Sequence, residues 1–213
     1  MELRKSAEWV AVGGLSDPSK MPGWAYGIPA RACKVGGKLA RVANSVCEKC
    51  YARRGRYVFG NVKAAQERRL LALNDPKWAQ NMITLIKRVK EKHFRWHDSG
   101  DLQSLKHLKD IVYIAEKCPD VQFRLPTKEV ALVREYMQHD IVPDNLCISV
   151  SAPMMDQRIP SLGYQTSMVV SNGSPIPKDV FECPATMPDG DHRCGDCRAC
   201  WDNNVTCVAY HKH

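Results

Sequence analysis

Cysteines are the residues whose type and spacing in this chain point most directly to chemistry. The chain contains ten, and three of them recur at every third position in the stretch CGDCRACW. This C-x2-C-x2-C spacing is typical of ferredoxin-type chains, which wrap a [4Fe-4S] cluster and take a further cysteine from elsewhere. A fourth cysteine lies just upstream in FECPAT. The predicted ligands are Cys183, Cys194, Cys197 and Cys200.

A second set of cysteines, Cys33, Cys47 and Cys50, lies in the first quarter of the chain. Three thiolates satisfy three irons of a cubane cluster and leave the fourth iron open to substrate, water or another ligand. Alternatively, the trio joins one C-terminal cysteine in a purely structural site. Zinc stays open as well, because it is often held by two separated C-x2-C pairs and Cys47 with Cys50 forms one such pair. The sequence predicts one or two [4Fe-4S] clusters, with zinc as the alternative.

The other cysteines are read differently. Cys147 lies in an apolar run and Cys118 at the end of a predicted helix, so both are interpreted as small packed hydrophobes, and Cys207 is intermediate. No apolar run reaches the roughly 18 to 20 residues of a membrane span, and the start of the chain lacks a secretory apolar region. We therefore expect a cytoplasmic protein without membrane contact, whose thiols are reduced and whose clustered cysteines bind metal.

Composition indicates one globular domain over 1–213, with a cysteine-rich loop at 22–57 and a cysteine-rich segment at 181–213. Hydrophobic residues make up 44% of the chain and charged residues 25%, which argues against a mainly disordered or membrane-spanning protein. The formal net charge of +8 favours anionic partners, either nucleic acid or a phosphorylated small molecule.

The hydrophobic period alternates between helix and strand through the middle of the chain, which predicts parallel βαβ units. Asn61 and Thr127 are the predicted N-caps of two of the helices. Five or six such units fit an α/β fold of the partial (βα)5-6 TIM-like barrel type. The predicted helices are 61–75, 76–93, 102–118 and 128–139, and the predicted strands are 93–97, 121–125, 145–152 and 166–173, with weaker strands at 8–14 and 204–210.

In parallel sheets the chemistry collects beyond the carboxyl ends of the strands. His97, Asp98 and Asp101 follow a predicted strand and are the candidate catalytic residues, as acid, base or ligand. The structural alternative is that Asp101 or Ser104 caps the next helix and that Asp98 accepts hydrogen bonds from turn amides. Lys128 follows the next strand and would either pair with an anion or be a solvated lysine.

The early cysteine loop is also strongly basic. Between residues 34 and 56 seven basic residues stand against one acidic residue, Glu48, and Tyr51 and Tyr57 are interleaved with them. These charges would raise the reduction potential of a cluster or guide a phosphate-bearing partner, and the tyrosines would offer surfaces on which a base stacks. The alternative is a merely solvated face. The seven are Lys34, Lys38, Arg41, Lys49, Arg53, Arg54 and Arg56.

Four stretches, CEKCYARRGRY, FRWHDSGDLQS, FRLPTKEV and NLCISVSAPMMDQR, resemble the phage-encoded gene product eighty-eight family. The resemblance runs from about Pro22 to Trp201, and it implies a protein of the host-cell cytoplasm with no established activity. More distantly, the C-xn-C-x2-CYA opening, the later TK and the strand that ends in SVS resemble radical S-adenosylmethionine proteins related to spore photoproduct lyases.

The distant resemblance implies a partial barrel with an open [4Fe-4S] cluster that binds S-adenosylmethionine. Cys33, Cys47 and Cys50 take the ligand positions, although their C-x13-C-x2-C spacing departs from the usual C-x3-C-x2-C. The turn at 99–101 falls where such enzymes hold the methionine amino group. The residues that the resemblance assigns to cofactor binding are Ser99, Gly100, Lys128, Ser149, Ser151 and Asn172.

Three classes of function follow from these observations. The first is a radical-type enzyme that uses an open cluster and S-adenosylmethionine. The second is a non-catalytic redox protein, or one that engages a host protein, in which clusters stabilise a small fold. The third is a zinc-stapled nucleic-acid-binding protein.

Overall fold

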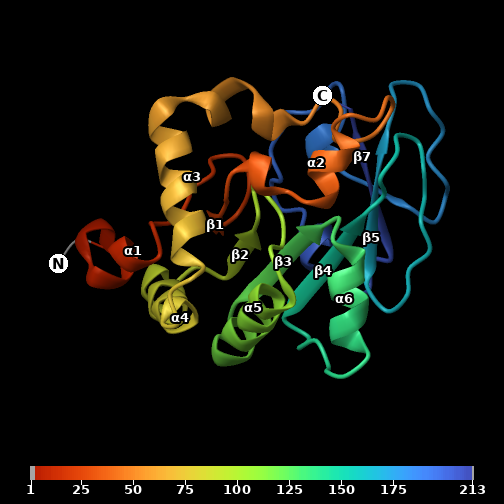
Figure 1. Cartoon of the computed structure of the whole chain (residues 1–213). Helices are drawn as coiled ribbons and strands as arrows, with labels where there is room; N and C mark the ends of the chain where they lie inside the picture. Colours follow the sequence, from red (N-terminus) through yellow and green to blue (C-terminus); the bar gives the residue numbers. More distant parts are fainter. Residues whose placement is uncertain (1–2, 213) are drawn as a thin grey trace.

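A single parallel sheet organises the chain. The computed structural model describes residues 3–212, and its seven strands lie in the order β1-β2-β3-β4-β5-β7-β6 with every neighbouring pair parallel (Figure 1). The strands are β1 (Trp24–Tyr26), β2 (His93–Trp96), β3 (Gln122–Thr127), β4 (Leu146–Ser151), β5 (Gln165–Val170), β6 (Phe181–Glu182) and β7 (Cys207–His211).

The longer helices are amphipathic and bury their apolar stripes against the sheet. In α5, Ser104 accepts a hydrogen bond from the His107 amide as an N-cap, and Leu108, Ile111 and Ala115 are buried. The helices are α1 (Ala7–Ala11), α2 (Val35–Leu39), α3 (Gly60–Ala72), α4 (Trp78–Val89), α5 (Leu105–Lys117) and α6 (Val130–Met137). The 3-10 turns are η1 (Leu3–Lys5), η2 (Ala30–Ala32), η3 (Tyr51–Arg53), η4 (Gly55–Val58), η5 (Pro184–Thr186) and η6 (Ala199–Trp201).

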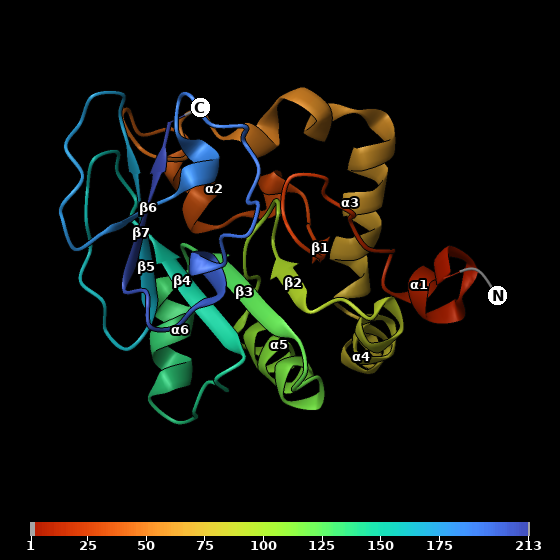
Figure 2. The ribbon, with the colours of Figure 1, turned by 180° about the vertical axis from the view of Figure 1, so that it is seen from behind.

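The two faces of the sheet carry different chemistry. Successive side chains of a strand point to opposite faces, so the register pairs Phe94 with Phe123 on one face and Arg95 with Arg124 on the other. The phenylalanines join the core beneath α4 and α5. The C-terminal segment crosses the other face, where η6 lies against β3 and β4 (Figure 2). We call these the helix face and the open face.

The predicted α/β class with parallel strands is confirmed, and the predicted helices and central strands are found. In residues 3–212, β1 and β6 are the two edges of the sheet, and no pairing between them closes a barrel. None of the described helices is both long and apolar enough to cross a lipid bilayer.

The predicted strand at 8–14 is wrong, and the two short strands β1 and β6 were not predicted. The stretch 8–14 is not a strand but contains most of α1, which begins where the Ser6 hydroxyl accepts a hydrogen bond from the Trp9 amide. The first strand is instead β1, whose three residues are too few to show a period. The two-residue strand β6 is missed for the same reason.

Both predicted N-caps are also wrong. Helix α3 begins one residue earlier, with Phe59 at its N-cap, and Asn61 lies inside its first turn. Thr127 ends β3, and Glu129 occupies the N-cap of α6. The Thr127 hydroxyl nonetheless accepts a hydrogen bond from the Glu129 amide at 3.0 Å, because it lies just outside the helix start.

Candidate functional site

The first cysteine group, Cys33, Cys47 and Cys50, converges around one point. Gly36 has no side chain there, and a Cβ added to it would lie 3.4 Å from Cys47 Sγ and 3.9 Å from Cys33 Sγ. Burial, together with the nearby Asp101, Cys50 and Cys47, raises the pKa of the Cys33 thiol to about 12. Burial also raises the pKa of Cys47. The sequence-distant thiols of this group are therefore neighbours in space.

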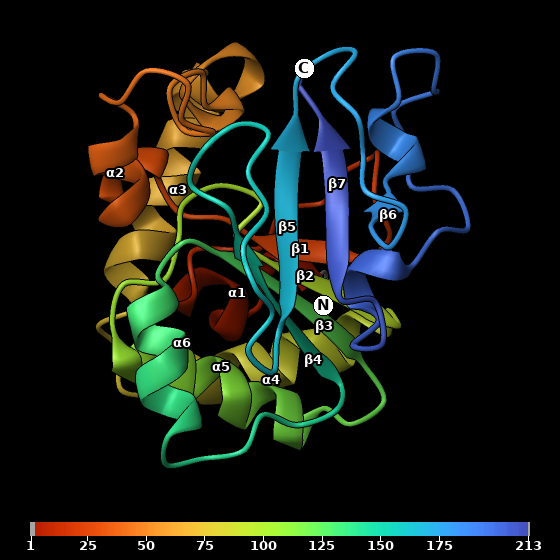
Figure 3. The ribbon, with the colours of Figure 1, turned by 90° about the vertical axis from the view of Figure 1, so that its right-hand side faces the viewer.

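Backbone and side-chain contacts hold this group at the carboxyl end of the sheet. Figure 3 shows α2 at the end of the molecule toward which the β5 and β7 arrows point. The loop is tied to the segments that follow β2, β3 and β4. These ties are Gln103 Nε2 to the Ala32 carbonyl at 3.3 Å, the Val35 amide to Glu129 Oε1 at 2.8 Å, and the Val46 amide to the Pro153 carbonyl at 3.0 Å.

Asp101 and Lys128 lie beside the first cysteine group. The buried Asp101 carboxylate accepts hydrogen bonds from the Thr127 hydroxyl at 2.5 Å and from the Lys128 amide at 2.9 Å. Burial raises the pKa of Asp101 to about 6, although the Thr127 and amide hydrogen bonds oppose that shift. Asp101 thus joins the loop after β2 to the end of β3, and Ser104 rather than Asp101 caps the following helix α5.

The Lys128 ammonium is enclosed rather than solvated. Its Nζ donates to the Ala152 carbonyl at 3.0 Å, and burial lowers its pKa, while Cys47, Asp101, Cys50 and Cys33 act in the opposite direction. Lys128 is therefore a half-buried cation beside three thiols.

His97 lies elsewhere. Its ring contacts His107 of α5 at 5.3 Å between centroids, and neither of its buried nitrogens has a hydrogen-bond partner in the described residues. Burial and the neighbouring His107 lower its pKa well below the usual value. His97 is therefore a neutral core residue, and the structure does not bring it to the cysteines.

The turn after β2 is held tightly. The Asp98 carbonyl accepts hydrogen bonds from the Tyr51 and Tyr57 hydroxyls at 2.8 and 3.3 Å. Burial raises the pKa of the Asp98 carboxyl, and its Oδ1 has no partner among the described residues. Ser99 Oγ donates to the Ile28 carbonyl at 2.8 Å. The turn therefore serves mainly to fix the early loop.

Gly100 lies in the left-handed region with φ of 83°. A Cβ there would fall 2.7 Å from the Ile28 carbonyl oxygen, so only glycine fits.

Three residues assigned by the distant resemblance have different surroundings. Ser149 and Ser151 lie on the open face of β4. Ser149 is fully buried, and its hydroxyl has no hydrogen-bond partner among the described residues, whereas Ser151 accepts a hydrogen bond from the Ser167 hydroxyl at 3.1 Å. Asn172 is exposed in the turn after β5, and its side chain has no hydrogen bond within residues 3–212. The serines therefore line the sheet interior, whereas Asn172 does not.

The second cysteine group, Cys183, Cys194, Cys197 and Cys200, lies over the open face. Burial raises the pKa of the Cys194 thiol, and the neighbouring Cys200 and Cys197 act in the same direction. Burial and the neighbouring Cys200 also raise the pKa of the Cys183 thiol. Cys183 and Cys200 pack with Trp201 and Val208. Cys200 Sγ lies 3.0 Å from Tyr210 Oη.

Sequence reasoning missed two arginines, Arg95 and Arg124, that lie near the second cysteine group. Arg124 is only 8% exposed, and its Nη2 donates to Tyr210 Oη at 2.5 Å, while Arg95 donates to Tyr51 Oη at 3.4 Å. Within residues 3–212 neither forms an ion pair with a carboxylate, and each has a buried Nε without a partner. The repeated FR in FRWH and FRLP was the available signal, because it puts both arginines on one face.

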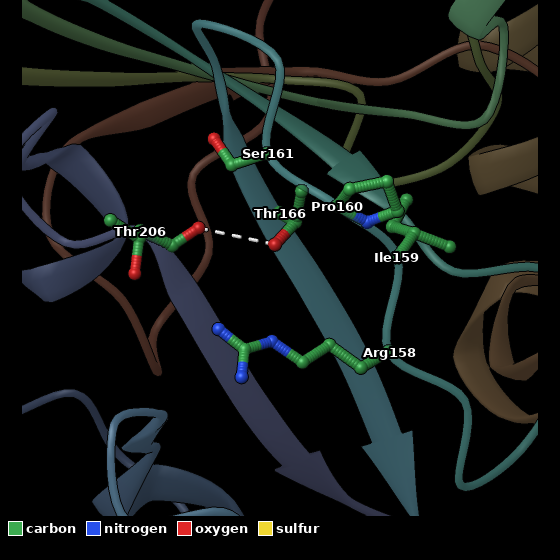
Figure 4. Close-up of a pocket in the computed structure, with 6 residues that line it drawn as sticks. All are labelled: Arg158, Ile159, Pro160, Ser161, Thr166 and Thr206. Carbon is green, nitrogen blue, oxygen red and sulfur yellow. Dashed lines mark hydrogen bonds between the residues drawn. The ribbon is translucent and has the colours of Figure 1, made fainter.

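Two cavities lie apart from the cysteine groups. One, of about 270 Å³, opens at the start of β5 and β7, where Thr166 Oγ1 donates to the Thr206 carbonyl and Arg158 lines the wall (Figure 4). That is the amino end of the strands, which in such folds usually serves stability. A groove of about 400 Å³ lies between Trp24, Tyr57 and α3.

As arranged, no group of three or more His, Cys, Asp or Glu side chains in residues 3–212 could hold a metal ion. Fold and site together define a parallel α/β protein with two cysteine groups, one at the carboxyl end of the sheet and one over its open face.

The chain belongs to the gene product 88 family, whose family model matches residues 2–203. The resemblance to that family is thus confirmed. No curated protein and no solved structure matches the chain, and the comparisons do not relate it to radical S-adenosylmethionine proteins.

Proposed function

We propose that this protein binds [4Fe-4S] clusters through its two cysteine groups. The observation that carries the proposal is the gathering of seven of the ten cysteines, from both ends of the chain, beside Arg95, Arg124 and Lys128, none of which forms an ion pair within residues 3–212. The remaining three cysteines are buried. Cys118 and Cys207 belong to apolar clusters, whereas Cys147 is paired in register with Arg124. Most of the thiols therefore lie close to positive charge that no ion pair balances within residues 3–212.

The two arginines of the open face supply the electrostatic reason. Arg124 is buried and Arg95 is half-buried, and a buried charge without an ion-pair partner is costly, so negative charge nearby stabilises Arg124 above all. The positive charges of both act on Cys194, and neutral thiols would leave them unbalanced. Four thiolates around a cubane cluster carry a net negative charge that matches two guanidinium groups.

The spacing of the thiols favours a cluster over zinc. The four sulfurs of a zinc site all lie about 2.3 Å from one ion, whereas cluster thiolates bind different irons and stand farther apart. The C-x2-C-x2-C run of the second group fits the second case better.

The first group has three thiols and is the candidate open site. Cys33, Cys47 and Cys50 would hold such a cluster beside the Lys128 side chain, and its three cysteine ligands would leave room for a further ligand such as S-adenosylmethionine. The chemistry that a reduced cluster would supply there is one-electron reduction. Lys128 would attract the carboxylate of such a ligand, and Asp101 would hold Lys128 in place. The open face of β4, with Ser149 and Ser151, would complete the interior of a partial barrel.

The second group supports a different role. It has four thiols, and two of them pack against Trp201. A cluster with all irons ligated has no open position, so this centre would transfer electrons or stabilise the C-terminal segment.

The experiment is anaerobic purification followed by iron, sulfide and zinc analysis and electron paramagnetic resonance. Wild-type protein should hold about eight irons, because each cubane holds four. Changing all three cysteines of the first group to serine should remove about half, and changing Cys194, Cys197 and Cys200 should remove the other half. Cys118→Ala, at a buried cysteine outside both groups, should remove none.

Colourless protein loaded with zinc, or with no metal under anaerobic conditions, refutes the cluster proposal. For the open site, S-adenosylmethionine should change the resonance spectrum of reduced wild-type protein and of Cys118→Ala. An unchanged spectrum would reduce the function to non-catalytic electron transfer or structure.

A further inference from the structure

The segment 31–59, which carries the first cysteine group, presents concentrated positive charge to solvent. It contains eight lysines and arginines against Glu48 alone, and all eight are exposed. Arg31 pairs with Glu67. In the described part of the chain, no ion pair joins any of the other seven to a carboxylate. The charge of this surface is therefore available to an anionic partner.

Exposed apolar side chains are interleaved with these charges. Of the eleven large hydrophobic residues exposed among the described residues, four fall between residues 42 and 59. Phe59 is 57% exposed and Tyr51 is 48% exposed. Such a mixture of cationic and aromatic side chains on one short segment is unlike a merely solvated face, which would carry charges alone.

The aromatic rings are held in place before any partner arrives. The Tyr51 and Tyr57 hydroxyls both donate to the Asp98 carbonyl, and their rings lie 5.6 Å apart with an angle of 59° between their planes. Ala52, the central residue of η3, is buried. A ring fixed in this way loses little conformational freedom when another flat group stacks on it.

We infer that this surface, defined by Tyr51, Arg53, Arg54, Arg56 and Phe59, binds single-stranded nucleic acid. Cationic side chains contact the phosphates, and the exposed rings stack on unpaired bases. A duplex keeps its bases stacked inside and cannot use the rings. A membrane surface is normally met by a longer amphipathic helix, whereas η3 and η4 span three and four residues.

The inference goes beyond the proposed function and does not require metal. The surface adjoins the first cysteine group, because the charge of Arg53 acts on both Cys33 and Cys47. A bound strand would therefore lie beside the proposed open cluster.

The test measures fluorescence anisotropy of a labelled single-stranded DNA of about 16 nucleotides with the full chain. Arg53→Gln/Arg54→Gln/Arg56→Gln should weaken binding at least about tenfold and reduce the slope of log affinity against log salt by about 2. The matched charge control is Lys87→Gln/Lys92→Gln/Lys117→Gln, at three exposed lysines near the other end of the sheet. This variant should change the affinity less than about twofold.

The stacking part has its own controls. Phe59→Ala should weaken binding about tenfold, Phe59→Trp should keep it, and Ile141→Ala, at an exposed aliphatic residue outside the surface, should have no effect. Equal weakening by both triple variants, equal affinity for duplex of the same sequence, or preferential binding to vesicles of anionic lipid would overturn the inference. Metal content measured on each sample separates this outcome from failure of the cluster proposal.

Discussion

Gly36 and Gly37 provide the sharpest test of the first cysteine group, because they are neighbours in α2 and differ in what surrounds them. Neither has a left-handed backbone, so alanine at either position should stabilise the helix by about 0.5 kcal/mol through the unfolded state. A Cβ at Gly37 meets nothing within 4 Å. A Cβ at Gly36 would lie 3.3 Å from Cys33 Cβ and 3.4 Å from Cys47 Sγ.

The structure sets the size of the effect. At those distances the cysteines must move by a few tenths of an ångström, whereas metal–ligand distances tolerate only about 0.2 Å. Gly36→Ala should therefore lose at least about half of the iron bound by the first group, since thiolate–iron geometry at two of its three ligands is disturbed. Gly37→Ala should retain all of it.

Anaerobic iron analysis and resonance spectra of the two variants measure this difference, with chemical denaturation as the check on folding. Equal iron content in Gly36→Ala and Gly37→Ala, with both variants folded, would refute the idea that the sulfurs converge on a metal centre at Gly36.

Three further predictions concern buried groups. Burial, with a contribution from Lys106, lowers the pKa of His107 from 6.5 to about 3, so the unfolded chain takes up the proton first and stability falls as pH drops below 6.5. At about pH 5 the loss is about 2 kcal/mol, and urea unfolding of His107→Gln should lack that part of the pH dependence. Gly100→Ala should cost about 2 kcal/mol or more, whereas Gly173→Ala, with φ of 84° and an open surrounding, should cost only the backbone strain of about 1 kcal/mol. Arg124→Met should lower the reduction potential or metal content of the second group in a spectroelectrochemical titration, and increased stability without metal loss would contradict its role as a counter-charge.

Sequence patterns were sufficient for the parts of the fold that depend on local chemistry. Ser104 and the apolar stripe of α5 predict that helix because a hydroxyl N-cap and a 3.6-residue period are local properties. The β-branched run of β4 predicts a buried strand in the same way. Strands of two or three residues, such as β6 and β1, carry no period and could not be found.

In the candidate site, too, local spacing could be predicted from the sequence, whereas contacts between distant segments could not. The C-x2-C pattern keeps Cys47 with Cys50, and Cys194 with Cys197 and Cys200, because it spans about one turn of chain. It does not reach Cys33 or Cys183. Whether Cys33 lies near Cys47 depends on the hydrogen bonds that fasten the early loop to the segments after β2, β3 and β4. Those contacts join residues far apart in sequence.

Charge and orientation were decided by tertiary structure alone. His97 follows a strand like a catalytic residue, yet its ring packs against His107 in the core. In the sequence, Arg95 and Arg124 look like ordinary strand arginines. The parallel pairing of β2 and β3 places them side by side on the open face. The amino-acid sequence determined which chemical groups this protein has and which segments become helix or strand, since both are set within a few residues. Which of those groups meet, and whether a buried charge is balanced, was determined by the long-range pairing of strands and loops.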